Sequence, residues 1–158
     1  DLFLDDFLDE MIGEGGTINH MILTHPDSDH ARGLRMAMDR YTVENFYCTG
    51  QKEISDNTGM NDYIQPGCDI HRISTFTATT SKQPYECYLS GPDTNYGPGW
   101  DPKVRVRVLS ADDSKTADSE KNERSLVIKL SLGESSFYFG GDSEGAQEDA
   151  IRVNTPDE

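Results

Sequence analysis

The chain has 158 residues, a length that suits one domain with a single core and is short for two. Its 29 acidic residues exceed its 14 basic ones, and the formal net charge of -15 disfavours non-specific binding to a nucleic-acid backbone. Hydrophobic residues make up 34% of the chain and no apolar run approaches the roughly 20 residues of a membrane helix, so we expect a domain without a membrane segment.

The N-terminal part predicts a helix, a strand, a second helix and a second strand. Leu2–Ile12 places apolar side chains on one helical face and acidic ones opposite, and glycines at 13–16 end this helix. Ile18–Thr24 has the length of a buried strand, His30–Tyr41 has helical spacing, and Val43–Cys48 is a further strand. A helix between two strands predicts a parallel crossover, which places the segment before that helix at the carboxyl end of the first strand.

The C-terminal part is richer in strands. Asp69–Phe76 is an expected strand, and the alternating run "VRVRVL" predicts another. The runs "SLVIKLSL" and "SSFYF" on either side of Gly133–Glu134 predict a hairpin. We expect a final helix over Ser143–Val153, capped by Asp142 or by Ser143.

Loops and cysteines complete the survey of the chain. Residues 91–103 and 112–122 are polar or rich in Gly and Pro, and we expect surface loops there. The three cysteines, Cys48, Cys68 and Cys87, have no CxxC spacing and cannot all pair with one another. Free thiols in a reducing compartment are favoured, and the cytoplasm is the expected location.

One short motif, "THPDSDH", concentrates ligand-type side chains where the first strand is expected to end. It contains His25, Asp27, Asp29 and His30 within six positions. Imidazole and carboxylate groups bind zinc and harder divalent ions such as manganese. The alternative is an Asp-rich turn in which Ser28 or Asp29 caps the following helix, but capping explains neither histidine. We therefore predict a metal site.

Spacing suggests how these residues divide between two ions. Residues two apart in an extended segment point the same way, so His25 and Asp27 can meet one ion while Asp29 and His30 reach a second. Asp142, at the end of "FYFGGD", is the best candidate for a further ligand and could bridge both. Two divalent ions about 3.5–4 Å apart hold a bridging hydroxide that attacks a substrate without a protein nucleophile.

The motif resembles the metal-binding signature His-x-His-x-Asp-His of the metallo-β-lactamase fold superfamily, with Asp27 in place of the second histidine. It looks most like the hydrolase domain of the ComEC-type DNA-uptake proteins. A later stretch is similar to the family's paired strands that follow Asn-x-x-Ser and end in Gly-Asp; the matching positions here are Asn122, Ser125, Gly141 and Asp142. The aspartate at position 27 makes the first ion position harder and zinc there less secure.

This resemblance implies an α/β (α+β) fold of the αββα sandwich type over one domain, residues 1–158. Family members have an Asp-x-Gly strand before the first helix and a histidine motif after Gly-Asp, so the domain is expected to be incomplete here. The implied function is a metal-dependent hydrolase, a phosphodiesterase or nuclease, acting on nucleic acid or a nucleotide, with two zinc or manganese ions. Asp29 holds the ion that activates water, and Asn122 and Ser125 support the site.

Two alternatives to this function remain. A degenerate, non-catalytic relative would keep the fold and bind a partner, and a lactam or thioester hydrolase is disfavoured. We expect His20 and His71 to be structural, and Gly33 to mark a close approach in its helix. The oligomeric state is open.

Overall fold

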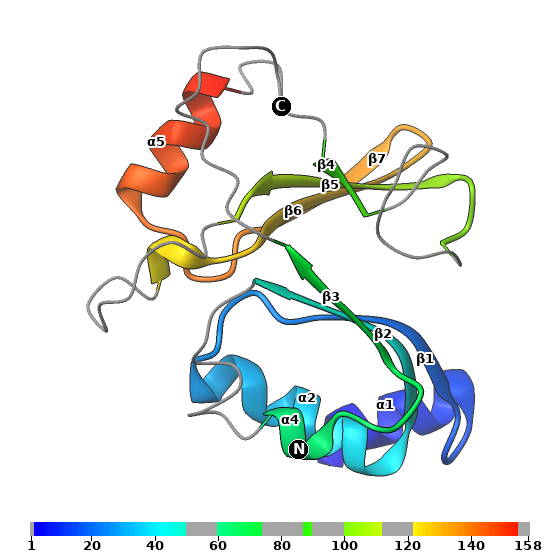
Figure 1. The fold of residues 1–158 in the computed structure, drawn as a ribbon. Helices are drawn as coiled ribbons and strands as arrows, with labels where there is room; N and C mark the ends of the chain where they lie inside the picture. Colours follow the sequence, from blue (N-terminus) through cyan, green and yellow to red (C-terminus); the bar gives the residue numbers. More distant parts are fainter. Residues whose placement is uncertain (1, 50–59, 74–86, 90–99, 112–121, 155–158) are drawn as a thin grey trace.

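The structure is a computed structural model that describes residues 2–49, 60–73, 87–89, 100–111 and 122–154. Its described part is a mixed α/β arrangement with two small sheets (Figure 1). The elements are, in chain order, α1 (Leu2–Ile12), β1 (Thr17–Ile22), α2 (Ser28–Arg40), β2 (Thr42–Thr49), α4 (Met60–Tyr63), β3 (Asp69–Ile73), β4 (Cys87–Tyr88), β5 (Val104–Ser110), the 3₁₀ turn η2 (Asn122–Arg124), β6 (Val127–Leu132), β7 (Ser135–Phe139) and α5 (Gly145–Asn154).

The first sheet has the order β1-β2-β3, and all its strands are parallel. His20 lies opposite Asn45 on β2, and Tyr47 lies opposite His71 on β3. The predicted crossover is thus confirmed: α2 connects two parallel strands. The segment between β1 and α2 lies at the carboxyl end of β1, where parallel sheets commonly place ligands.

The second sheet has the order β4-β5-β6-β7 and is antiparallel. The hairpin between β6 and β7 is confirmed, and Gly133 at its turn has a φ of 60°. The strand β4 was not predicted, because two residues carry no periodic signal. The strand β7 is an edge strand on which every residue is exposed, including Phe137 and Phe139.

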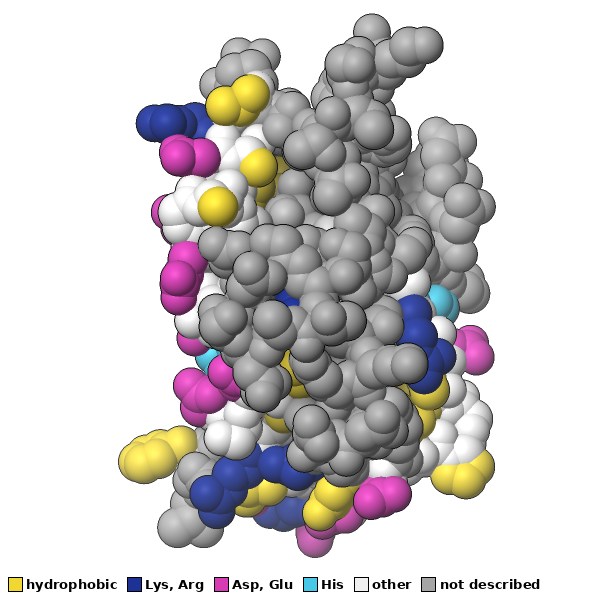
Figure 2. Space-filling model, turned by 60° about the vertical axis from the view of Figure 1, so that its left-hand side comes forward, with side chains coloured by type: hydrophobic (Ala, Val, Ile, Leu, Met, Phe, Trp, Pro, Cys, Tyr) yellow, Lys and Arg dark blue, Asp and Glu magenta, His cyan; other side chains and the backbone are white. Residues whose placement is uncertain are grey.

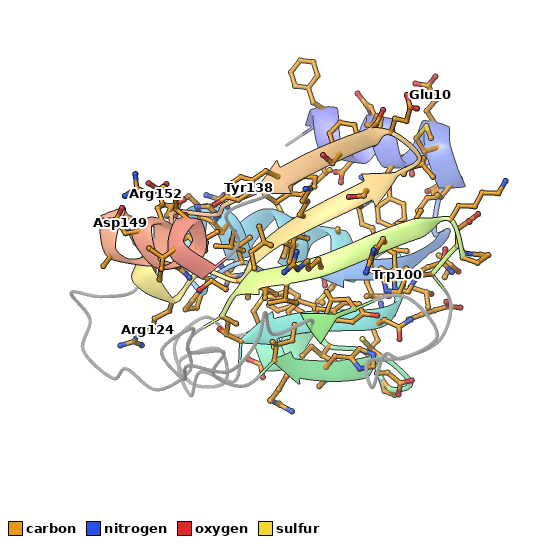
Figure 3. All side chains as sticks on the ribbon, turned by 90° about the horizontal axis from the view of Figure 1, so that it is seen from above. Glu10, Trp100, Arg124, Tyr138, Asp149 and Arg152 are labelled. Atoms are coloured by element: carbon orange, nitrogen blue, oxygen red, sulfur yellow. The ribbon has the colours of Figure 1, made fainter. Side chains whose placement is uncertain are left out.

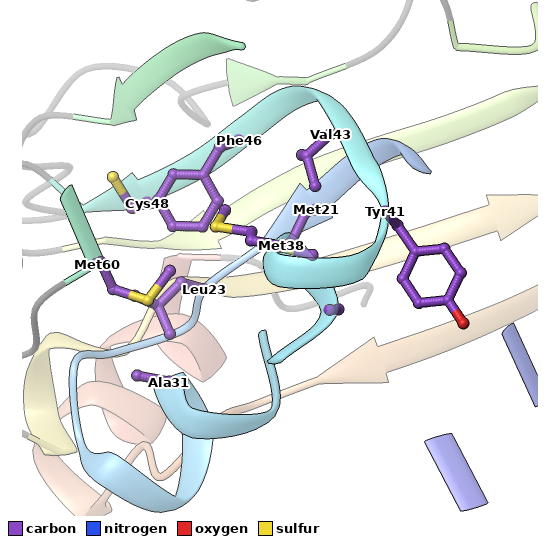
Figure 4. Packing of buried hydrophobic residues seen from close by; sticks show 10 residues of the cluster. Met21, Leu23, Ala31, Met38, Tyr41, Val43, Phe46, Cys48 and Met60 are labelled. Carbon is purple, nitrogen blue, oxygen red and sulfur yellow. The ribbon is translucent and has the colours of Figure 1, made fainter. Parts of the chain in front are cut away.

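Helices lie on the outer sides of the two sheets (Figure 1). Helices α2 and α4 pack against the first sheet through a buried cluster (Figure 4) whose members include Met21, Met38, Phe46 and Met60, with Leu8 of α1 packed against it. A second cluster joins the two sheets: Tyr47, Ile73, Leu89, Val106, Val108, Ala111, Leu126 and Ile128. Leu109, Val127 and Ile151 of α5 form a third. The order of layers is therefore helices, sheet, sheet, helix.

Two expected helix starts are wrong. Helix α2 begins at Ser28 with Asp27 as its N-cap, and the Asp27 side chain forms no cap hydrogen bond. The N-cap is therefore Asp27 rather than Ser28 or Asp29, which both lie inside the helix. Helix α5 begins at Gly145, and its first backbone bonds are accepted by the carbonyl of Glu144 rather than at Asp142 or Ser143. Both helices begin within or just after a run of polar residues. A pattern of apolar residues does not locate such boundaries well.

Some expectations fall wholly or largely outside the described residues. Of the predicted loop 91–103 only 100–103 is described, and it forms a turn in which Lys103 N donates to Asp101 Oδ1 at 2.8 Å. Of the loop 112–122 only Asn122 is described. The end of the strand predicted over Asp69–Phe76 is undescribed beyond Ile73.

The surface agrees with the acidic composition. Figure 2 shows acidic side chains along one side of the described surface, with basic and hydrophobic side chains among them. In Figure 3, Asp149 and Arg152 lie on α5 at one end of the second sheet, and Trp100 lies toward the other end. In the part of the chain that is described, no helix is long and apolar enough to cross a membrane.

Candidate metal centre

The residues after β1 connect the two sheets and fix the position of the motif. Leu23 N donates to the carbonyl of Tyr47 on β2 at 2.9 Å, which continues the first sheet by one residue. The next carbonyl, that of Thr24, accepts from Leu126 N at 2.8 Å, just before β6 of the second sheet. His25 therefore follows a segment that is hydrogen-bonded on both sides, and its side chain is fully buried.

Three predicted ligands come together at this point. The His25 and His30 rings lie 4.0 Å apart between centroids. Asp142 comes from the turn after β7; its Oδ1 lies 3.0 Å from His30 Nε2 and its Oδ2 lies 3.8 Å from His25 Nε2. The three residues each offer one ligand atom within 4.8 Å of the others. Two histidines and a carboxylate at this spacing can hold one divalent ion.

The other two predicted ligands lie at the margin of this cluster. Asp27 Oδ2 is 3.8 Å from His25 Nε2, and Asp29 Oδ2 is 3.7 Å from His30 Nε2. The Asp27 side chain is 39% exposed and that of Asp29 is 76% exposed. Each aspartate thus lies close to the histidine with which spacing paired it, and Asp29 is the more exposed of the two.

The protonation state of His25 favours ligation. Burial lowers the pKa of His25 below its usual 6.5, and the neighbouring charge of His30 lowers this pKa further, while Asp142 and Asp27 oppose the shift. A neutral imidazole has one nitrogen lone pair available for a metal. His25 Nε2 is buried and has no hydrogen-bond partner among the described residues. A buried polar atom without a partner is costly, so this one fits a site for a bound ion.

Thr24 contacts both histidines and was not predicted as a site residue. Its Oγ1 lies 3.3 Å from Nδ1 of His25 and 3.3 Å from Nδ1 of His30. A hydroxyl oxygen has two lone pairs, so Thr24 can accept an N–H from both rings. Protons on both Nδ1 atoms would leave both Nε2 atoms as ligands facing Asp142. Thr24 directly precedes the first histidine, but this adjacency alone does not indicate a contact with both imidazoles.

The backbone of Asp142 is held in place by a glycine turn and by a hydrogen bond to Ser125. Gly141 has a φ of 57°, a left-handed conformation that glycine adopts readily, and it redirects the chain at the end of β7. The Asp142 N–H donates to Ser125 Oγ at 3.1 Å, and Ser125 is fully buried. Asn122 accepts from Ser125 N through its carbonyl at 3.1 Å, and its Nδ2 donates to Glu144 Oε1 at 2.7 Å. Both predicted supporting residues thus contact segments that carry the site.

The remaining histidines lie elsewhere. His20 stacks on Trp100 with centroids 3.9 Å apart, and its Nδ1 lies 3.2 Å from the Tyr47 hydroxyl. His71 Nε2 lies 3.0 Å from Asn45 Oδ1. Both have structural partners, as expected. The expectation for Gly33 is wrong, because a Cβ there would lie 3.9 Å from its nearest neighbour, Leu4 Cδ2, an ordinary contact.

Comparison with known proteins adds no assignment. No protein-family model matches this chain, and no curated protein matches it.

Proposed function

We propose that this chain is a metallo-hydrolase of the metallo-β-lactamase fold that acts on phosphodiesters. The observation that carries the proposal is the convergence of His25, His30 and Asp142 from two distant segments around a buried imidazole nitrogen that lacks a described partner. A bound cation would satisfy His25 Nε2 and the Asp142 carboxylate together.

We propose two ions, and the arrangement of the carboxylates is compatible with this number. The two oxygens of Asp142 lie nearest different histidines, Oδ2 toward His25 and Oδ1 toward His30. Asp27 accompanies His25, and Asp29 accompanies His30. Two-metal hydrolases have a similar arrangement, in which two groups of ligands hold two neighbouring ions. Carboxylate-rich groups of this kind suit zinc or manganese.

The fold supports the family proposal. The order helices, sheet, sheet, helix is compatible with an αββα sandwich. The candidate site lies beside the hydrogen bond from Leu126 N to the Thr24 carbonyl, which joins the segments after β1 and before β6. The two motifs that resemble the family, around His25 and around Asp142, meet in space. The ComEC-type DNA-uptake hydrolases are the members that the motif resembles most, and a nucleic acid or nucleotide is the substrate class proposed from this resemblance.

The chain's own residues have distinct roles in this proposal. Bound divalent ions would supply Lewis-acid chemistry and activation of water. His25, His30 and Asp142 bind them, and Thr24 orients both imidazoles through their Nδ1 atoms. Asp29, the most exposed of the acidic groups, completes the second group of ligands and is the proposed catalytic ligand.

A non-catalytic metal-binding or partner-binding module is the second candidate. It is favoured by the exposure of Asp27 and Asp29, which leaves part of the ligand set loosely held. Such a module would bind metal through His25, His30 and Asp142 without turning over a phosphodiester.

Metal stoichiometry tests the site. We expect purified protein to take up divalent metal, zinc or manganese, and His30→Ala and Asp142→Ala to lower the metal content measured by elemental analysis. Asp149→Ala is the matched control, because this carboxylate pairs with Arg152 on the exposed face of α5. Equal metal content in the wild type and both site variants would refute the site.

Turnover separates the enzyme from the binding module. With a chromogenic phosphodiester and manganese or zinc, we expect activity that Asp29→Asn lowers by orders of magnitude while circular dichroism stays unchanged. Metal binding without any turnover would favour the non-catalytic module. Turnover retained in Asp29→Asn would remove Asp29 from the catalytic site.

A further inference from the structure

A buried glutamine on α5 contacts the segment that holds the candidate site. Gln147 is only 6% exposed and lies in the first turns of α5. Its Nε2 donates to the carbonyl of Ser125 at 2.7 Å and to Ser110 Oγ, at the end of β5, at 2.9 Å. One side-chain amide therefore joins the last helix, the second sheet and the segment before β6.

The orientation of this amide is fixed by its partners. The Ser125 carbonyl can only accept a hydrogen bond, so the group facing it must be the NH₂ of Gln147. This orientation leaves Gln147 Oε1 buried with no hydrogen-bond partner among the described residues. A buried acceptor without a partner costs free energy, so the amide would be a poor choice if it only filled space. Its N–H groups hydrogen-bond to Ser110 and Ser125, which an apolar side chain of the same size could not do.

Ser125 connects Gln147 to the site in two directions. Ser125 Oγ accepts the N–H of Asp142 at 3.1 Å, which fixes the backbone of the shared carboxylate. The next residue, Leu126, donates its N–H to the carbonyl of Thr24 at 2.8 Å, which fixes the segment before His25. Displacement of the Ser125 peptide would therefore move both halves of the ligand set relative to each other.

We infer that Gln147 is a positioning residue of the metal centre, acting through the Ser125 peptide on Asp142 and on the Thr24–His25 segment. This inference rests on the proposed function, since it concerns the same metal site. Among the described residues, Gln147 donates its hydrogen bonds to Ser110 and Ser125 and not to a proposed ligand. Its effect on metal affinity is expected to be like that of other outer residues that orient ligands, about 10- to 100-fold.

The test compares two substitutions that remove hydrogen bonds of the same amide. Gln147→Met keeps an unbranched side chain but removes both donors. Ser110→Ala removes only the bond between Gln147 and β5 and leaves the one to Ser125. In calorimetric titrations with zinc and with manganese, we expect about 10- to 100-fold weaker binding by Gln147→Met and binding within about twofold of wild type by Ser110→Ala. Gln147→Asn, whose side chain is one methylene shorter and withdraws the amide from the Ser125 carbonyl, is expected to behave as Gln147→Met does and serves if the Met variant does not fold.

A second readout does not depend on metal. Hydrogen exchange of the Asp142 amide in metal-free protein is expected to be faster in Gln147→Met than in Ser110→Ala, because its acceptor on Ser125 is less well placed. Wild-type protein that binds no metal would refute the proposed function. Metal binding by wild type, together with equal affinity or equal Asp142 exchange in Gln147→Met and Ser110→Ala, would overturn the inference alone.

Discussion

Substitution of Gly141 by alanine tests whether the turn that carries Asp142 is packed as tightly as the structure indicates. A Cβ at Gly141 would lie 2.8 Å from Ser125 Oγ and 2.9 Å from Thr24 Cβ, closer than side chains normally approach. Both neighbours support the candidate site, and Ser125 Oγ also accepts the Asp142 N–H. An added methyl group must therefore displace the turn, Ser125 or Thr24.

Gly133 provides a matched control for this substitution. Its φ of 60° is close to the 57° of Gly141, so alanine meets a similar backbone penalty at both positions, about 1–2 kcal/mol. A Cβ at Gly133 has no neighbour within 4 Å. The close contacts at Gly141 add the cost of overpacking, about 1–3 kcal/mol. We expect Gly141→Ala to lower the free energy of unfolding by about 2–5 kcal/mol and Gly133→Ala by about 1–2 kcal/mol.

The measurement is urea unfolding of metal-free protein, followed by circular dichroism, for wild type and both variants. Metal-free conditions ensure that the difference reports packing rather than loss of a bound ion. The two variants share their backbone penalty, so the difference between them isolates the contacts with Thr24 and Ser125. Equal destabilisation by Gly141→Ala and Gly133→Ala would show that this turn is not closely packed, and would refute the reasoning that Gly141 fixes Asp142.

Two further predictions concern other residues. Thr24→Val keeps the side-chain shape but removes the hydroxyl shared by both imidazoles, so calorimetry should show about 10- to 100-fold weaker metal binding, whereas Thr24→Ser should bind within a few-fold of wild type. Burial lowers the pKa of His71 below 6.5 in the folded protein. As the pH falls, the imidazole of the unfolded chain is therefore protonated before that of the folded chain, and the free energy of unfolding should decrease below about pH 6.5. His71→Gln, which can still donate to Asn45, should make thermal unfolding less dependent on pH between about pH 7 and about pH 5; an unchanged dependence would contradict the assignment.

The helices and longer strands follow closely from the sequence. The helix predicted over Leu2–Ile12 has the same bounds in the structure, because an amphipathic pattern and a glycine-rich stop both mark it. The hairpin around Gly133 also follows, since two apolar runs flank a turn. Strand β1 ends at Ile22, two residues before the prediction, because the Thr24 carbonyl bonds to Leu126 near the second sheet. That bond joins residues about a hundred positions apart, and no local pattern predicts it.

The candidate site likewise contains residues that the sequence predicts and residues that only the folded structure reveals. His25, His30 and Asp142 could be proposed from residue type, spacing and a motif, and the structure brings them together. Thr24 and Gln147 could not be proposed from the sequence, because their roles depend on atoms that approach only in the folded chain. Threonine next to a histidine and glutamine in a helix are common, and neither carries a signal of its own until its partners are known.

The location of the site explains why its supporting contacts are tertiary. His25 follows β1 of the parallel sheet and His30 lies in the first turn of α2, whereas Asp142 lies in the turn after β7 of the antiparallel sheet. The distance between the two groups of ligands therefore depends on how the sheets pack. The bond between Leu126 N and the Thr24 carbonyl fixes that distance at the site itself. One residue earlier in the same segment, the Ser125 carbonyl accepts a hydrogen bond from Gln147 of α5. Substitutions that loosen the junction should therefore weaken metal binding more than they disturb either sheet, because each sheet keeps its own backbone ladder.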